Sequence, residues 1–230
     1  MRLQIMKFKY LIAAAISMAA ISLTALAGTA LAGTNHVLYN ADGVTVTPVG
    51  TTFSAQSTVS SPVTLSNGAI VVNCTMTVPG KVTDNGSVTG IPTAALYNSA
   101  ATPSNVSFSG CNVTVAGIPF GSGTVVANGD TSTNPWVLTM PMTGNPGTIS
   151  GADVTISWSI FSCKFHQNAT NNVVGDWTNS TPSNVVLSGT LAYYGGSGAG
   201  ICGATGSITG QVNLNTTSTP GNNLEILPNP

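Results

Sequence analysis

The chain has 230 residues, of which 42% are hydrophobic and only 5% are charged, and its formal charge at pH 7 is −1. This balance excludes nucleic acid as a partner, because neutralising several phosphates requires a matching set of Lys and Arg side chains. An ordinary globular domain has about a quarter of its residues charged, so Thr, Ser, Asn and Gly must supply most of the polar surface here. Low charge also removes one barrier to self-association and adsorption.

Residues 1–32 predict a signal peptide for export. Three basic residues stand within the first nine positions, an apolar run follows from Tyr10 to Leu26, and Ala30-Leu31-Ala32 offers small residues for cleavage. The apolar run is short for a membrane span and no basic segment follows it, so we expect cleavage and no transmembrane anchor afterwards. The mature chain then keeps two lysines and six acidic residues, a formal charge of −4.

The mature length suits one sizeable domain, and we expect a single β domain over 33–230. Two stretches nearly repeat, TPSNVSFSG at 102–110 and TPSNVVLSG at 181–189. Thr-Pro-Ser-Asn is turn chemistry, so in each copy we expect a turn that leads into a strand. Two related halves, about 33–145 and 146–230, a coincidence of composition and a duplicated binding site all stay open.

Almost every periodic stretch has the period of two that is typical of β-strands. Apolar side chains alternate with Thr and Ser from Val154 to Ile160, which predicts one apolar and one hydroxyl-bearing face. Similar runs predict strands at 69–78, 106–115, 122–127, 135–140, 184–194 and 206–215, with turn signals at 84–86, 128–130, 144–147 and 195–200. The sequence therefore predicts an all-β fold, a two-sheet sandwich of Greek-key or immunoglobulin-like type.

Four cysteines in an exported chain predict two disulfides, for which three pairings are possible. The spacing favours Cys74 with Cys111 and Cys163 with Cys202, one pair in each half. Each would close a loop of nearly forty residues and stabilise the fold by roughly 4 kcal/mol in the chain-entropy description. A metal site is disfavoured, because no C-x-x-C occurs and histidine is present only twice.

The segment from Gly198 to Gly203 matches the dinucleotide fingerprint G-x-G-x-x-G. That fingerprint binds a cofactor only where a strand runs into a helix, and the residues that follow here have the pattern of a strand. We therefore interpret the segment as a hairpin loop and expect no cofactor.

A secreted hydrolase is the second alternative, and the sequence offers little support for it. No G-x-S-x-G is present, and the only possible histidine bases are His36 and His166. A pair of carboxylates that could face a sugar stays open among Asp42, Asp84, Asp130, Asp153 and Asp176. We expect the protein not to be an enzyme and assign no catalytic, cofactor-binding or metal-binding residue.

Large aromatic side chains are the candidate contacts for a hydrophobic surface. Trp158 lies in an alternating run and is expected in the core, whereas Trp177 stands among turn residues in GDWTN and is expected to be partly exposed. Trp177, Tyr193 and Tyr194 are therefore our candidate interface residues. The alternative is that Trp177 only covers one end of the sandwich.

The order of several short motifs, together with the cysteine frame, resembles the exported bacterial protein activators of alkane oxidation. The residues that carry the resemblance are Asn73–Val78, Gly80–Val82, Gly86–Gly90, Pro135–Thr139, Asp176–Asn179, Leu187–Gly189, Cys202 and Gly206–Ile208. The chain departs from that pattern in its longer segment before Cys74 and in the loop from Gly195 to Gly200.

The resemblance implies a secreted, non-catalytic helper that promotes growth on long-chain alkanes, with alkane droplets or another hydrophobic interface as its partner. It places the protein outside a bacterium or on its surface, and related proteins are associated with adhesion and biofilm. An adhesive or matrix protein that self-assembles is the main alternative. A chaperone–usher pilin is disfavoured, because residues 225–230 lack the alternating final strand and penultimate aromatic of that family.

Overall fold

A computed structural model describes residues 36–40, 43–96, 106–130, 134–140, 146–180, 182–198, 200–216 and 224–228. The predicted signal peptide, Asp42 and the first-copy turn at 102–105 lie outside these residues. Every regular element in the described ranges is a β-strand, and the strands pair antiparallel, which confirms the predicted all-β class. The sandwich topology stays a prediction.

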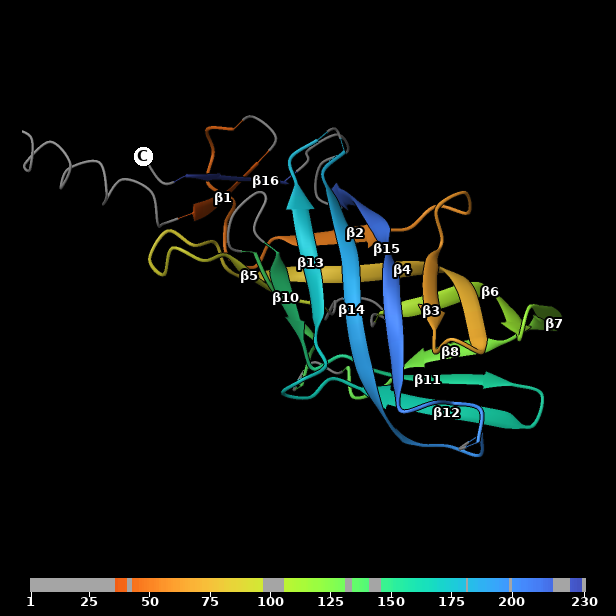
Figure 1. The fold of residues 1–230 in the computed structure, drawn as a ribbon. Helices are drawn as coiled ribbons and strands as arrows, with labels where there is room; N and C mark the ends of the chain where they lie inside the picture. Colours follow the sequence, from red (N-terminus) through yellow and green to blue (C-terminus); the bar gives the residue numbers. More distant parts are fainter. Residues whose placement is uncertain are drawn as a thin grey trace, which may run out of the picture.

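The strands are distributed over nearly the whole described chain (Figure 1). Their bounds are β1 His36–Asn40, β2 Thr52–Gln56, β3 Val63–Ser66, β4 Ile70–Asp84, β5 Thr93–Ala95, β6 Ser107–Val115, β7 Ile118–Ser122, β8 Thr124–Ala127, β9 Val137–Thr139, β10 Gly147–Ser150, β11 Asp153–Trp158, β12 Phe161–His166, β13 Val173–Thr178, β14 Asn184–Gly195, β15 Thr205–Thr216 and β16 Leu224–Pro228. Each predicted strand region contains one of them. The sequence did not predict β7, which shares only Ser122 with a predicted region, and it predicted none of β1, β2, β3, β5, β10, β12, β13 and β16.

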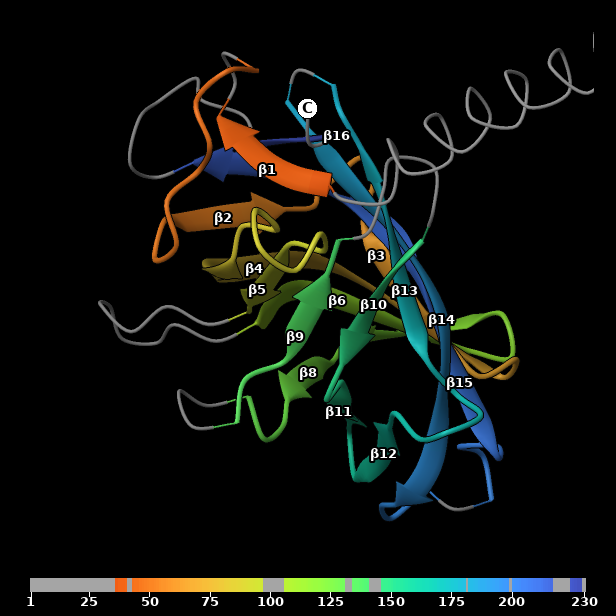
Figure 2. The same ribbon diagram turned by 90° about the vertical axis from the view of Figure 1, so that its left-hand side faces the viewer.

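Three long strands, β4, β14 and β15, organise the large sheet, which contains β2 to β15. Each changes its neighbours along its length. The first half of β4 pairs with β3 and β6 and its second half with β2 and β5. In the same way β14 pairs first with β13 and then with β12, while β15 pairs first with β3 and then with β2. In Figures 1 and 2, β13, β14 and β15 form one layer that crosses β2, β4 and β6 steeply.

These changes of neighbour close the sheet into two circuits that share β4, β14 and β15. The terminal circuit runs β2–β4–β5–β9–β10–β13–β14–β15 and lies beside the small β1–β16 sheet. The hairpin circuit runs β3–β4–β6–β8–β11–β12–β14–β15, with β7 attached to β6 alone. Both circuits contain strands from before and after residue 145.

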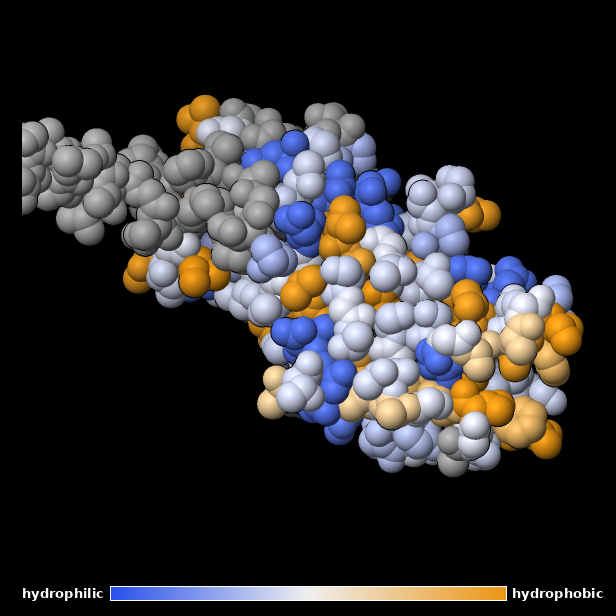
Figure 3. Space-filling view, viewed as in Figure 1, coloured by the Kyte–Doolittle hydropathy of each residue, from blue (hydrophilic) through white to orange (hydrophobic). Residues whose placement is uncertain are grey.

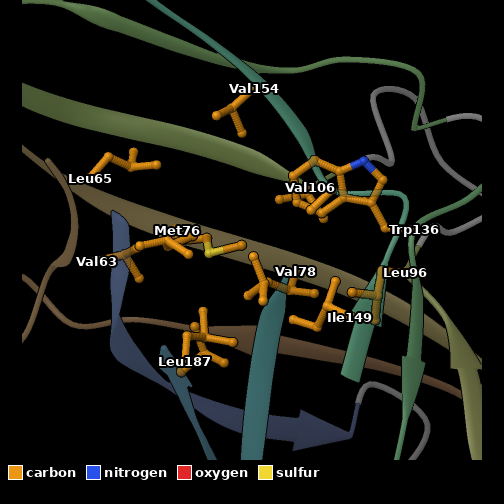
Figure 4. Packing of buried hydrophobic residues seen from close by; sticks show 14 of the residues in the cluster. Val63, Leu65, Met76, Val78, Leu96, Val106, Trp136, Ile149, Val154 and Leu187 are labelled. Carbon is orange, nitrogen blue, oxygen red and sulfur yellow. The ribbon is translucent and has the colours of Figure 1, made fainter. Parts of the chain in front are cut away.

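Side chains from the inner faces fill both circuits. Burial alternates along β4, where Ile70, Val72, Cys74, Met76 and Val78 are all buried. Met76 and Val78 extend from β4 toward residues of β10 and β14, among them Ile149 and Leu187 (Figure 4). Close packing also restricts which residue can occupy position 80. A Cβ on Gly80 would clash with the ring of Phe53, so only glycine leaves room for that ring.

The predicted disulfide pairing is confirmed, and both bonds lie in the hairpin circuit. Cys74 of β4 is bonded to Cys111 of the neighbouring β6. Cys163 of β12 is bonded to Cys202 in the loop between β14 and β15. All four sulfurs are therefore buried in one part of the molecule.

The two copies of the repeated stretch both lead into strands, as predicted. β6 begins at Ser107 and β14 at Asn184, and the valine of each copy, Val106 and Val185, is 4% exposed. The strands occupy different places in the sheet, because β6 pairs with β4, β7 and β8 whereas β14 pairs with β12, β13 and β15. The shared letters thus specify a strand start and a buried valine in each half.

Candidate functional site

Exposed apolar side chains stand in two neighbouring hairpins at one end of the hairpin circuit, which we call the hairpin end. Ile118 and Phe120 of the β6–β7 hairpin are 63% and 55% exposed, and Ile160 and Phe161 of the β11–β12 hairpin are 81% and 37% exposed. Figure 3 shows apolar surface gathered at this end, on the right of the view. Val126 of β8 and Val186 of β14 are also exposed, and the other exposed aliphatic residues stand outside the strands: Val44, Val46, Val49, Val59, Val88 and Ile91.

Ile160 corrects one prediction. The alternation from Val154 to Ile160 predicted that Ile160 belongs to the apolar face of a strand, but β11 ends at Trp158 and the chain turns at Ser159 and Ile160. Trp158 pairs with Phe161 across this turn, and Ser159 adopts a positive φ of 50°. Ile160 is therefore exposed because it occupies the turn itself.

The β6–β7 hairpin is open to solvent along its whole second strand. Every residue of β7 is exposed, and in the described part of the chain β7 pairs with β6 only. The turn at Ala116 and Gly117 uses positive φ angles of 49° and 82°. Natural edge strands are commonly protected by charges, bulges or proline, and β7 relies on Pro119 and a register shift without any charge.

The β14–β15 loop braces the β11–β12 hairpin. The Ser197 hydroxyl accepts a hydrogen bond from the Ser162 amide at 2.9 Å and donates one to the Ile160 carbonyl at 3.0 Å. The Gly198 amide also donates to the Ser162 carbonyl at 3.0 Å, and the Cys163–Cys202 disulfide follows directly. The exposed turn is therefore held in one conformation by the segment that the sequence predicted to be a hairpin loop.

A groove of about 270 Å³ separates the two hairpins where they diverge. It is lined by Ser122, Gly123, Thr124, Ser157, Trp158 and Ser159. The ladder between β8 and β11 ends at the Thr124–Ser157 pair. Beyond this pair the two chains separate, because β7 pairs with β6 while β11 turns back to pair with β12. The hairpin end therefore combines exposed apolar side chains with a groove lined by hydroxyl groups.

The interiors of the circuits offer far less space. One void lies between Leu65, Phe165 and Leu191 in the hairpin circuit, and another between Phe53, Met76 and Leu187 in the terminal circuit. Their volumes are about 10 and 20 Å³, room for about one water molecule each. Neither of these two voids is large enough to hold an alkane chain.

Trp158 and Trp177 were predicted to differ in exposure, but both are buried in the structure. Trp158 is 4% exposed, which confirms its predicted place in the core. The expectation that Trp177 is partly exposed is wrong: it is 3% exposed, and its indole N–H donates to Asn179 Oδ1 at 2.9 Å. The first four residues of GDWTN belong to strand β13, in which Val173, Gly175 and Trp177 are buried on the inner face. Trp177 therefore cannot be a surface contact in this fold.

Tyr193 and Tyr194 lie next to each other on β14 and point to opposite faces. Tyr193 packs edge-on against the buried Phe165, with ring centroids 5.8 Å apart. Tyr194 is 45% exposed, and its ring stacks on His166 at 4.7 Å. Of the three predicted interface aromatics, Tyr194 is thus the most exposed, and it lies on the outer face of β14 away from the two hairpin turns.

Tyr194 belongs to a small polar cluster on the outer face. Its hydroxyl donates to both carboxylate oxygens of Asp153, at 3.0 and 3.1 Å, and Asn128 Nδ2 donates to Asp153 Oδ1 at 2.8 Å. Partial burial, and then the hydrogen bond and charge of Asp153, raise the pKa of Tyr194 above its ordinary value. His166 lies directly across from Asp153 in the ladder between β11 and β12.

Asp130 is the other carboxylate that the fold uses. It is buried, and its two oxygens accept hydrogen bonds from the amides of Val106, at 2.9 Å, and Trp136, at 3.1 Å. Burial raises the pKa of this carboxyl group, and the two amides oppose that shift. Asp130 thus joins the start of β6 to the segment before β9.

Among the described residues, no three His, Cys, Asp or Glu side chains gather closely enough to hold a metal ion. The same ranges contain no helix with the length and apolar character needed to cross a membrane. The molecule is an all-β, antiparallel protein braced by two disulfides. No protein-family model, curated protein or solved structure matches the chain.

Proposed function

We propose that the chain is exported and that the mature protein is a non-catalytic helper that promotes contact with long-chain alkanes at the oil–water interface. Two disulfides support export, because such bonds form and persist outside the reducing cytoplasm. The sequence resemblance to activators of alkane oxidation is the reason for proposing long-chain alkanes as the partner. The observation that carries the proposal is the hairpin end, with four exposed apolar side chains in two adjacent hairpins.

The magnitude of this contact favours adsorption. Fully burying one large apolar side chain contributes about 1.5–3 kcal/mol, so burying the exposed parts of Ile118, Phe120, Ile160 and Phe161 in oil contributes roughly 4–7 kcal/mol. That is several times the thermal energy of about 0.6 kcal/mol. No charged side chain has to be desolvated, because residues 118–124 and 157–163 contain none.

A surface of this kind should respond little to ionic strength. Salt screens interactions between exposed charges, and the hairpin end has no charges to screen. The purified protein should therefore lower hexadecane–water interfacial tension and stabilise a hexadecane emulsion to a similar degree at low and high salt. A folded protein with no interfacial activity at either salt concentration would refute the proposal.

An adhesive or matrix protein that self-assembles is the second candidate, and the free edge of β7 favours it. An exposed strand edge without charges can pair with a strand of another copy. Sedimentation velocity and fibre formation across a range of protein concentrations distinguish the two candidates. Assembly that Phe120→Lys abolishes, in a protein inactive on oil, would select the adhesive function.

A further inference from the structure

The groove between the two hairpins has a chemistry of its own, apart from the apolar side chains around it. Four of its six lining residues, Ser122, Thr124, Ser157 and Ser159, carry a hydroxyl group. Within the described part of the chain these hydroxyls form no hydrogen bond with another protein group. Four residues with hydroxyl groups therefore line one groove, and none of these hydroxyls is occupied by another protein group in the described ranges.

Hydroxyls elsewhere on the outer strands are used differently. Thr139 bonds Thr148 at 2.7 Å across β9 and β10, and Ser66 bonds Ser207 at 2.8 Å across β3 and β15. Such pairs satisfy each other and strengthen the sheet. Thr124 and Ser157 lie opposite each other in the last pair of the β8–β11 ladder, but their hydroxyls do not bond each other.

The shape of the groove depends on a glycine. A Cβ at Gly123 would lie 2.4 Å from Val113 Cγ2 and 3.0 Å from the Ser157 carbonyl oxygen. Only glycine lets the chain pass this close to β11 and then diverge into β7. The groove is thus built into the backbone of the hairpin circuit. One wall includes β8, which pairs with the disulfide-bonded β6, and the other includes β11, which pairs with the disulfide-bonded β12.

We infer that this groove is a binding site for a neutral saccharide. Ser and Thr hydroxyls donate and accept hydrogen bonds, as sugar hydroxyls do, and four of them can satisfy several ring substituents together. No charged side chain lines the groove, which disfavours phosphate and carboxylate ligands.

The size of the groove limits the ligand. Pockets for drug-sized molecules occupy about 300–1,000 Å³, so a groove of about 270 Å³ takes one sugar ring. The ring can belong to a polysaccharide or to the headgroup of a neutral glycolipid, since both present the same hydroxyls. A single ring bound by four hydroxyls in an open groove is expected to bind with a Kd on the order of 1 mM.

Amide chemical shifts of the purified, disulfide-bonded protein test the inference. Neutral gluco-, manno- and galacto-oligosaccharides are titrated in parallel with an anionic oligogalacturonate. At least one neutral sugar is expected to give saturable shifts at residues 122–124 and 157–159. Phosphatidylcholine vesicles with and without a galactosyl diglyceride then separate a glycolipid headgroup from a soluble polysaccharide.

Matched variants tie the binding to the hydroxyls. Ser122→Ala/Ser157→Ala removes two groove hydroxyls and should weaken binding about tenfold or more, because each lost hydrogen bond costs about 0.5–1.5 kcal/mol. Ser107→Ala/Ser109→Ala removes two exposed hydroxyls of β6 outside the groove and should bind as the unmodified protein does. If the double variant is unstable, Thr124→Val tests the same point. It removes one groove hydroxyl, keeps the side-chain shape and should also weaken binding of the sugar.

Three results would overturn the inference. The first is the absence of groove shifts with every neutral saccharide, and the second is equal binding by the groove and control variants. The third is shifts along 118–122 that depend on protein concentration alone. That result would assign the site to strand addition by a second copy and not to a sugar.

Discussion

The two circuits share three long strands, yet they are stabilised in different ways. The terminal circuit is closed by β2, β5, β9, β10 and β13 and contains no disulfide, whereas both disulfides lie in the hairpin circuit. The hairpin circuit also carries the exposed apolar turns and the groove. Both disulfides are thus found in the circuit that carries the four exposed apolar side chains of the hairpin end.

The largest effect should come from the disulfides. Replacing Cys163 and Cys202 by Ser should lower the free energy of unfolding by roughly 4 kcal/mol, a large fraction of the 5–15 kcal/mol typical of a domain. Urea unfolding measures this change. Hydrogen exchange should show that amides of β11 and β12 lose protection before those of β10 and β13. Equal loss in both circuits would contradict the separate roles that we assign to them.

A core truncation in the terminal circuit should be nearly as costly. Trp177→Ala should lower the free energy of unfolding by about 3–5 kcal/mol, because it empties a buried site in β13. Interfacial activity per folded molecule should stay unchanged, since Trp177 is not on the surface. A specific loss of activity at full stability would restore Trp177 as an oil contact.

Asp130 links the start of β6 in the hairpin circuit to the segment before β9 in the terminal circuit, so removing one of its acceptor oxygens should destabilise the protein. Asp130→Asn leaves the amide of Val106 or Trp136 without its carboxylate oxygen, and an unsatisfied buried donor costs about 1–3 kcal/mol. Removing the buried charge, whose desolvation raises the Asp130 pKa, offsets part of this cost at neutral pH. Thermal or urea unfolding at neutral pH checks this value. A variant as stable as the unmodified protein would show that the Asp130 hydrogen bonds do not hold the junction.

The pH dependence of the same carboxyl group has a definite sign. Its pKa is raised in the folded protein above 3.8, so between 3.8 and the raised value the folded state binds more protons than the unfolded state. The Asp130 contribution therefore favours folding at the acidic side of this window and is lost as the pH rises through the folded pKa. Asp130→Asn should remove this part of the pH dependence of unfolding. An unaltered pH profile would contradict the assignment.

The smallest effect is expected on the outer face of the hairpin circuit. Tyr194→Phe removes the hydrogen bond to Asp153 at a half-exposed site and should cost about 0.5 kcal/mol. Asp153→Asn should lower the pKa of Tyr194, because the carboxylate contributes to raising it. Ultraviolet titration of the phenols measures this shift. A Tyr194 pKa that does not move would show that burial alone accounts for it.

Much of the fold could be predicted from local signals. The period of two located β4, β6, β14 and β15, because a strand with one buried face needs alternating side chains. The disulfide pairing followed from two cysteine pairs of similar spacing, one in each half. Asn128-Gly129-Asp130 predicted a turn after β8, and the chain bends there at Gly129, which has a positive φ of 66°. The strands and the turn depend on residues that are close in sequence, and the disulfides join cysteines 37 and 39 residues apart.

The candidate site depends on contacts that the sequence does not encode locally. Ser159-Ile160 lacks the glycine or asparagine that usually marks a two-residue hairpin turn, so the alternation predicted a continuous strand through it. Trp177 was misplaced because Gly175 and Asp176 were interpreted as turn residues, whereas glycine is needed there to make room for Val185. A missed signal was Gly117 between two apolar runs, which marks the β6–β7 turn.

Interfacial tension at a hexadecane–water boundary tests the central claim most directly. The variant Ile118→Ser/Phe120→Ser/Ile160→Ser/Phe161→Ser changes the hairpin end, and the control Val49→Ser/Val59→Ser/Val88→Ser/Ile91→Ser removes exposed apolar side chains elsewhere. With both proteins folded, the control should lower the tension as the unmodified protein does, and the hairpin-end variant should lose most of this activity. Equal activity of the two variants would contradict the claim that the hairpin end contacts the oil.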